Sequence, residues 1–361
     1  MKDKIMQINR RDFLGAAAMA GAGAVLSGCG TTGLAASTPH PDFMWADLVH
    51  LGINSWRDGY PNGKPSDNFH TRLRVAQPYM RTDEVEWKFC VDGLAAAGCN
   101  TLVIDMAEGI QYQSHPELSV KGSWSIEKFR AELDRIRRLG MEPVPKLNFS
   151  ATHDTWLGIY HRMVSTQKYY QVCADVIREV YEIFGKPRYF HLGYDEETPR
   201  HQAGHLYAVV RQGELWWHDF LWFNKQVEDL GARTWIWADY IWHHREEFEK
   251  RMPRSVLMSN WYYSQEFDAA NLDVAAYEWL DKAGFDQVPC GSNCLGKGTV
   301  ENFTHTVRYC MDKLDQKKLR GFLLAPWSRQ VPECHDQNVG ANKAMADAIS
   351  VYNEIKARSR G

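Results

Sequence analysis

Short apolar runs alternate with longer stretches of helical period from about residue 48 to the end of the chain. Eight of these runs have the length and the β-branched and aromatic content of strands. They cover residues 48–54, 100–105, 142–149, 188–193, 233–238, 255–260, 286–290 and 321–325. Between them, apolar residues recur three and four positions apart, which predicts amphipathic helices. The pattern therefore predicts a regular succession of βα units.

The predicted helices carry ordinary start and stop signals. Ser125 stands as an N-cap before one apolar face, and Asp83 stands in the same position before another. Four helices end just before a strand at Gly98, Gly140, Gly185 and Gly231. Eight strands, each followed by a helix, predict a single (β/α)8 barrel over residues 42–361. The alternative, an open doubly wound sheet, lacks the Gly-rich phosphate loop expected after its first strand.

The first 29 residues differ from the rest of the chain. Paired arginines, Arg10 and Arg11, precede an Ala/Gly-rich apolar run, and this arrangement resembles a twin-arginine export signal. The run ends in Leu-Ser-Gly-Cys, which resembles a bacterial lipobox with Cys29 as the lipidated residue. Residues 30–41 then predict a flexible tether. We expect a periplasmic or cell-surface lipoprotein of a bacterium; an ordinary secretory signal with a chance cysteine is the alternative.

Composition narrows the classes of function. Hydrophobic residues make up 44% and charged residues 24% of the chain, as in globular proteins, and the formal net charge is -3. No basic stripe is present, so nucleic acid is not an expected partner. The cysteines after Cys29 are scattered, without a CxxC pair, and we expect most of them to be buried small hydrophobes.

Acidic and aromatic residues gather at the predicted carboxyl ends of the strands, where a barrel of this kind places its chemistry. Tryptophans follow four strands and carboxylates follow three. An indole packs on the apolar face of a pyranose, while carboxylates and amides bind its hydroxyls, so the set predicts a sugar site. The residues expected to bind substrate are Asn54, Asp105, His153, Trp237, Asp239, Trp261, Tyr262 and Trp327.

Asp195 and Glu196 are the expected catalytic pair, because they stand at the carboxyl end of the fourth strand. Cleavage of a glycosidic bond needs one acid to protonate the leaving oxygen and a second group to stabilise the anomeric centre. The negative charge of Asp195 is expected to raise the pKa of Glu196 and keep it protonated near neutral pH.

The stretch from His191 to Glu196, His-Leu-Gly-Tyr-Asp-Glu, resembles the His-x-Gly-Gly-Asp-Glu motif of glycoside hydrolase family 20, the β-N-acetylhexosaminidases. The resemblance implies that Asp195 polarises the substrate's own 2-acetamido group and that Glu196 is the general acid and base. It further implies an exo-acting, retaining enzyme acting on N-acetylhexosamine glycans. Tyr194 stands where the motif has its second glycine.

Other mechanisms stay open at the level of sequence. The seventh strand ends without a glutamate nucleophile, and Asp239 could act as the base of an inverting enzyme. A barrel that binds sugar without cleaving it is a second class, and a metal-dependent hydrolase is a third. The residues that would serve the metal class are His153, Asp195, Asp239, His243 and His244. The preferred prediction has no metal and no cofactor.

Overall fold

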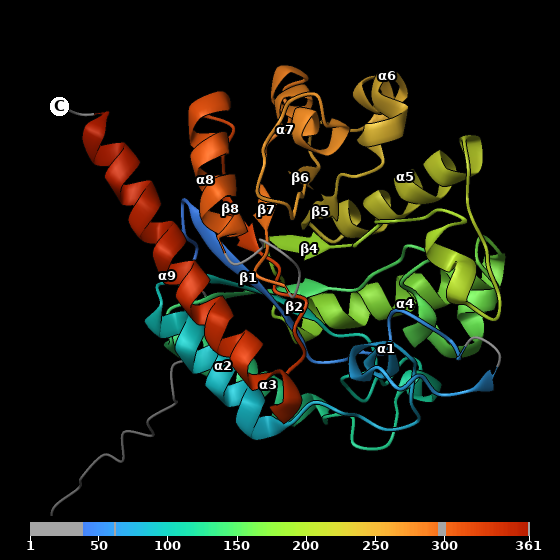
Figure 1. Cartoon of the computed structure of the whole chain (residues 1–361). Coiled ribbons are helices and arrows are strands. Elements are labelled where there is room, and N and C mark those ends of the chain that lie inside the picture. Colours follow the sequence, from blue (N-terminus) through green and yellow to red (C-terminus); the bar gives the residue numbers. More distant parts are fainter. Residues whose placement is uncertain (1–38, 61–62, 295–300, 360–361) are drawn as a thin grey trace, which may run out of the picture. The chain divides into compact units, whose positions relative to one another are not determined.

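The computed structural model describes residues 39–60, 63–294 and 301–359, and its centre is a sheet of eight parallel strands (Figure 1). The strands are β1 (Met44–His50), β2 (Thr101–Asp105), β3 (Glu142–Lys146), β4 (Tyr189–His191), β5 (Arg233–Trp237), β6 (Leu257–Ser259), β7 (Cys290–Gly291) and β8 (Gly321–Leu324). Neighbouring strands follow the order β6-β5-β4-β3-β2-β1-β8-β7. Apart from the β1–β8 junction, every pair in this order is consecutive in sequence.

The two ends of the sheet meet. The backbone N–H of Val288 donates to the carbonyl of Met258, and that of Cys290 donates to the carbonyl of Asn260, both at 2.8 Å. These bonds join the segment that leads into β7 to the segment around β6, so the sheet curls into a barrel. The predicted (β/α)8 barrel is therefore confirmed, and the open sheet is excluded.

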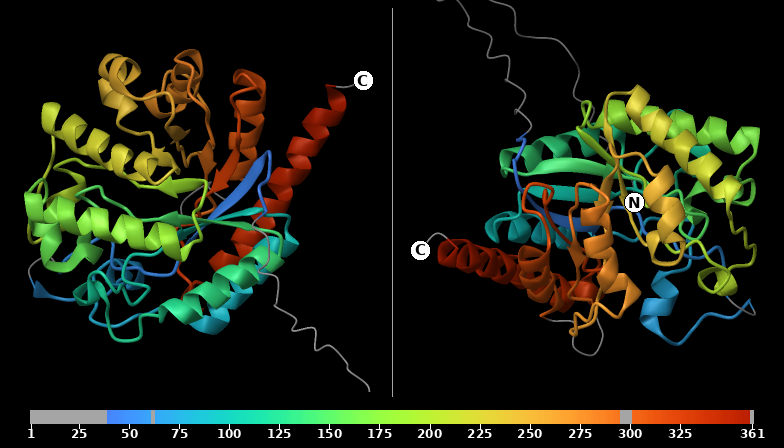
Figure 2. Two further views of the ribbon diagram at one scale, coloured as in Figure 1. Left: turned by 180° about the vertical axis from the view of Figure 1, so that it is seen from behind. Right: turned by 90° about the horizontal axis from the view of Figure 1, so that it is seen from above.

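Helices surround the barrel on the outside (Figure 2). They are α1 (Phe69–Leu73), α2 (Glu84–Ala96), α3 (Ile126–Arg138), α4 (Gln167–Ile183), α5 (Glu214–Asp229), α6 (Ile241–Arg251), α7 (Leu272–Lys282), α8 (Asn302–Lys313) and α9 (His335–Arg358). The predicted N-caps are present: Asp83 accepts from two backbone N–H groups of α2, and Ser125 accepts from one of α3. The short helix α1 lies in the long β1–α2 connection and was not predicted.

The first strand begins four residues earlier than predicted, at Met44 instead of residue 48. Its apolar pattern was obscured by Asp47, an acidic residue that is buried in the strand. Because β1 ends at His50, Asn54 belongs to the following loop and not to the strand end.

Successive residues of each strand point in turn into the barrel and out toward the helices, so the protein has an inner and an outer core. Met44, Ala46 and Leu48 point into the barrel, where they join Val103 and Val144 from neighbouring strands. The intervening residues pack against the helices. The same alternation turns Asp105 and Lys146 inward, and they form a buried ion pair inside the barrel.

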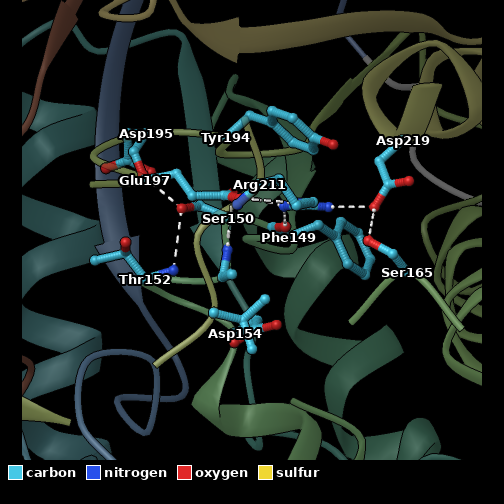
Figure 3. Close-up of polar contacts among 12 residues, drawn as sticks. Phe149, Ser150, Thr152, Asp154, Ser165, Tyr194, Asp195, Glu197, Arg211 and Asp219 are labelled. Carbon is cyan, nitrogen blue, oxygen red and sulfur yellow. Dashed lines mark hydrogen bonds and ion pairs between the residues drawn. The ribbon is translucent and has the colours of Figure 1, made fainter. Parts of the chain in front are cut away.

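A second buried ion network fixes the loop after β4 (Figure 3). The Arg211 guanidinium donates to both carboxylate oxygens of Glu197 at 2.7 Å, to Oδ2 of Asp219 at 3.0 Å and to the carbonyl of Phe149 at 2.7 Å. Oε2 of Glu197 also accepts from the backbone N–H of Ala151. The network therefore ties the β4 loop to the β3 loop and to α5.

Several predictions fall on residues 1–38, which lie outside the described part of the chain: the signal segment, Cys29 and most of the tether. Among the described helices, none combines the length and apolar character that crossing a membrane requires. Cys90, Cys99, Cys173, Cys290, Cys310 and Cys334 are buried and form no disulfide, as expected of small hydrophobes.

We predict that Arg211→Met lowers the free energy of unfolding by about 3–5 kcal/mol, because it leaves two carboxylates buried without their counter-charge. Urea unfolding of the purified protein measures this loss. The matched control is Arg178→Met, which removes an exposed ion pair with Asp175 and should cost under about 1 kcal/mol. Equal losses in the two variants would contradict a stabilising role for the network.

Candidate active site

The chain turns sharply where β4 ends. Gly193, Tyr194 and Glu196 have φ angles of 69°, 74° and 56°, in the left-handed region. A Cβ on Gly193 would lie 2.1 Å from Oδ1 of Asn148, so only glycine fits there. The turn sends the ring of Tyr194 against Trp216 and Phe220, at centroid distances of 5.3 Å each. Tyr194 therefore fills the outer core, while the next two side chains face the barrel mouth.

His153, in the loop after β3, stands between the two carboxylates of the Asp195-Glu196 pair. Its Nε2 lies 3.4 Å from Oδ2 of Asp195 and 3.2 Å from Oε2 of Glu196. Asp195 also accepts from Nδ2 of Asn148 at 2.8 Å, and Oε1 of Glu196 lies 3.4 Å from Nε2 of His201. The two acids thus share one imidazole, and each has a second partner of its own.

The charges around this triad set its protonation. Burial alone would lower the pKa of His153, but the charge of Asp195 and the hydrogen bond and charge of Glu196 outweigh it and raise that pKa. Burial alone would raise the pKa of Glu196, but the hydrogen bond and charge of His153 and the charges of His201 and Arg74 lower it. The predicted rise in the pKa of Glu196 was therefore wrong, because the sequence did not reveal a cation between the acids.

A cavity of about 810 Å³ opens above this triad. The predicted residues that line it are His153, Asp195, Glu196, Trp261 and Trp327. Trp56 and Tyr263 add further aromatic walls. Beneath Trp327 lies the buried Trp237, with ring centroids 5.9 Å apart. Acids and indoles therefore meet at one hollow.

The other predicted binding residues lie outside the cavity lining. Asn54 holds the chain around Gln77 and Arg81 by three hydrogen bonds. Asp105 is paired with Lys146 inside the barrel, and Tyr262 donates to the carbonyl of Glu266. Asp239 accepts from the backbone N–H of Glu196 at 2.9 Å, so it supports the turn that carries the pair.

The cavity also contains polar residues that the sequence analysis did not select. They are Arg57, His70, Arg74, Thr152, Arg200, His201, Cys294, Arg329 and Gln337. Arg57 directly follows Trp56, and Arg329 stands two residues after Trp327, so their nearness to tryptophans beyond the first and last strands was a usable signal. The others come from α1 and its C-cap, from the loops after β3, β4 and β7, and from the first turn of α9. No local pattern in the sequence shows that these segments border the same cavity.

A metal ion would find three ligand groups here. His153, Asp195 and Glu196 offer atoms that all lie within 4.8 Å of one another. Within the described ranges, Asp239, His243 and His244 are not part of that group. His244 instead stacks on Tyr240 at a centroid distance of 4.2 Å.

Comparison with known proteins gives one sequence match and several structural ones. Residues 7–27 match the family model described as "TAT (twin-arginine translocation) pathway signal sequence". No curated protein matches the sequence.

Solved structures of glycoside hydrolases match the fold at low sequence identity. An inactive mutant of a family 20 exo-β-N-acetylglucosaminidase from Vibrio harveyi matches with a TM-score of 0.56 and 12% identity, over 88% of this chain and 58% of that one. A β-N-acetylhexosaminidase from Bacteroides fragilis NCTC 9343 matches with a TM-score of 0.57 and 15% identity, over 88% and 70%. A family 5 glycoside hydrolase from Prevotella bryantii B14 matches with a TM-score of 0.50 and 11% identity, over 85% and 96%.

The chain thus spans less than two thirds of the Vibrio enzyme. At such identities the likeness establishes the fold and not the reaction. The chain carries a twin-arginine export signal and has the barrel fold found in glycoside hydrolases of families 20 and 5.

Proposed function

We propose that the protein is an exported glycoside hydrolase that releases N-acetylhexosamine from the end of a glycan, with retention of configuration. The observation that carries the proposal is the cavity itself, in which Asp195 and Glu196 face the same hollow as Trp261 and Trp327. A family 20 exo-β-N-acetylglucosaminidase and a β-N-acetylhexosaminidase share the fold, which supports this reading of the site.

Asp195 is the group that orients the substrate's acetamido substituent in this proposal. Asn148 and His153 hold its carboxylate, and its side chain is almost fully buried, so it is fixed before substrate binds. It would accept the amide N–H, and the amide oxygen would attack the anomeric carbon. The bond to the leaving oxygen breaks as the new bond forms, which gives a cyclic intermediate.

Glu196 is the group that transfers the proton. It delivers a proton to the leaving oxygen in the first step and removes one from the attacking water in the second. His153 bridges it to Asp195 and carries a proton over a wider pH range than an ordinary histidine, because its pKa is raised. A proton on Nε2 is therefore available to Glu196 as substrate displaces the resting ion pair.

Asp239 fits a supporting role better than that of a base in an inverting reaction. Burial and the neighbouring charge of Asp195 raise its pKa to about 8. A general base must be ionised to accept a proton, whereas Asp239 with this pKa is protonated near neutral pH. Its contact with the Glu196 backbone argues that it positions the turn.

Glu196→Gln is expected to lower kcat/KM about 100- to 10,000-fold, since it removes the transferable proton. The assay is hydrolysis of a β-linked N-acetylglucosamine disaccharide and of 4-nitrophenyl N-acetyl-β-glucosaminide and galactosaminide. The loss should be larger for the disaccharide, because its alcohol leaving group needs a proton more than nitrophenolate does. The matched control is Glu333→Gln, an exposed glutamate of the 3-10 segment Pro332–Cys334, which should keep full activity.

Three results would contradict the assignment. Equal activity of the wild type and Glu196→Gln would remove Glu196 from the reaction. Binding of hexosamine without turnover of any glycoside would indicate a sugar-binding barrel. Loss of activity on chelation, with restoration by a divalent cation, would favour the metal-dependent class instead.

We further propose that Cys29 is lipidated and anchors the protein after export. Cys29→Ser is expected to move the protein from the membrane fraction to the soluble fraction, because the acyl chains are lost. Immunoblotting of fractionated cells measures this shift. Cys294→Ser is the matched control and should leave the distribution unchanged; membrane association of Cys29→Ser equal to that of the wild type would contradict the anchor.

A further inference from the structure

The cavity is rich in cationic side chains. Four arginines line it: Arg57, Arg74, Arg200 and Arg329. They come from the loop after β1, the end of α1, the loop after β4 and the loop after β8. Separate segments of the chain thus bring guanidinium groups to one hollow, in a protein whose formal net charge is -3.

The ion pairs of the two cavity carboxylates are with histidines and not with these arginines. Asp195 is paired with His153, and Glu196 is paired with His153 and His201. Within residues 39–60, 63–294 and 301–359, none of the four arginines lies within ion-pair distance of an acid. In the described part of the chain, the guanidinium groups of the wall therefore have no carboxylate as a direct partner.

Arg329 is a buried cation in this cavity. Its side chain is only 6% exposed, and its guanidinium lies 4.3 Å above the ring of Trp56. It donates one hydrogen bond, from Nη1 to the carbonyl of Trp327, and its buried Nε has no partner in the described structure. Burial and the nearby charge of Arg74 lower the pKa of Arg329 to about 10, which still leaves it charged at neutral pH. A buried cation without a counter-ion costs stability unless a ligand supplies the anion.

Arg74 and Arg200 are exposed at the rim and are free to meet a ligand. Arg74 lies near enough to Glu196 for its charge to lower the pKa of that carboxyl. The arginine cluster and the Asp195-Glu196 pair therefore border the same cavity. The planar guanidinium fork matches the paired oxygens of a carboxylate or a sulfate group.

We propose that the substrate is an anionic glycan, in which the hexosamine or the sugar next to it bears a sulfate ester or a carboxylate. This inference rests on the proposed function, since it names the substrate class of the same site. The anion supplies the counter-charge that the cavity lacks, while the indoles and the carboxylate pair hold the sugar ring.

Calorimetric binding tests the proposal independently of turnover, in the Glu196→Gln protein. The three probes are N,N′-diacetylchitobiose as the neutral sugar, N-acetylglucosamine 6-sulfate, and a glucuronosyl-N-acetylglucosamine disaccharide. At least one of the two anionic probes should bind about tenfold or more tightly than the neutral one, and its advantage should shrink as salt is raised. Which anionic probe binds more tightly distinguishes a sulfate from a carboxylate.

Arg74→Gln and Arg200→Gln should each weaken the preferred anionic probe about tenfold and leave the neutral probe unchanged. Arg130→Gln, at an exposed arginine of α3, is the matched control and should change neither. Equal affinity for the three probes, binding of none of them, or equal losses in Arg130→Gln would overturn the proposal. If neutral aryl N-acetylhexosaminides are still hydrolysed in that case, the proposed glycosidase activity stands and only the anionic substrate is wrong. If anions bind through the arginines but no glycoside is hydrolysed, only the enzymatic proposal is wrong.

Discussion

The site depends on one charged contact, the bridge that His153 makes between Asp195 and Glu196. Two adjacent carboxylates at a barrel mouth repel one another, and a cation between them removes that repulsion. The left-handed turn at Gly193 and Tyr194 makes the contact possible, because it directs both acids to the same side. The buried Arg211 network then holds the next residue, Glu197, so the turn cannot relax.

Much of the fold was predictable because it follows from local periodicity. The eight apolar runs and the amphipathic helices between them predict the barrel. Asp83 and Ser125 mark two helix starts, because their side chains cap the first backbone N–H groups. The start of β1 was misplaced because Asp47 is buried within it, and an acidic residue inside a strand obscures the apolar run in the sequence. That error moved Asn54 to a strand end which it does not occupy.

The site was predictable only in part. Asp195, Glu196, His153, Trp261 and Trp327 come together as the strand-end argument expected. The inward pairing of Lys146 with Asp105, by contrast, requires knowledge of register between two strands. Arg74 and Arg200 lie on long connections, and no local pattern shows that those connections pass over the mouth. The sign of the Glu196 pKa shift failed for the same reason, since it depends on a neighbour 43 residues away in sequence.

The barrel by itself does not choose the reaction. Enzymes of family 20 and of family 5 both match it, with TM-scores of 0.56 and 0.50, so the chemistry has to be argued from the residues in the cavity. The imidazole of His153, shared by Asp195 and Glu196, is the basis for proposing a proton-transferring acid beside a fixed carboxylate. The cavity arginines, which have no carboxylate partner in the described residues, are the basis for proposing an anionic substrate. Both inferences use the same hollow, and the positive wall also affects the acid through the charge of Arg74.

The most direct measurement is the titration of the His153 ring by NMR in the wild type and in Glu196→Gln. If His153 bridges two carboxylates, its pKa lies above the ordinary value of about 6.5 and falls when the charge of Glu196 is removed. The stabilisation that protonated His153 gives to the two carboxylates is then fully present below pH about 6.5 and is lost as the pH rises through the raised pKa of His153. A histidine that titrates at or below about 6.5 in the wild type, with no response to Glu196→Gln, would contradict the account.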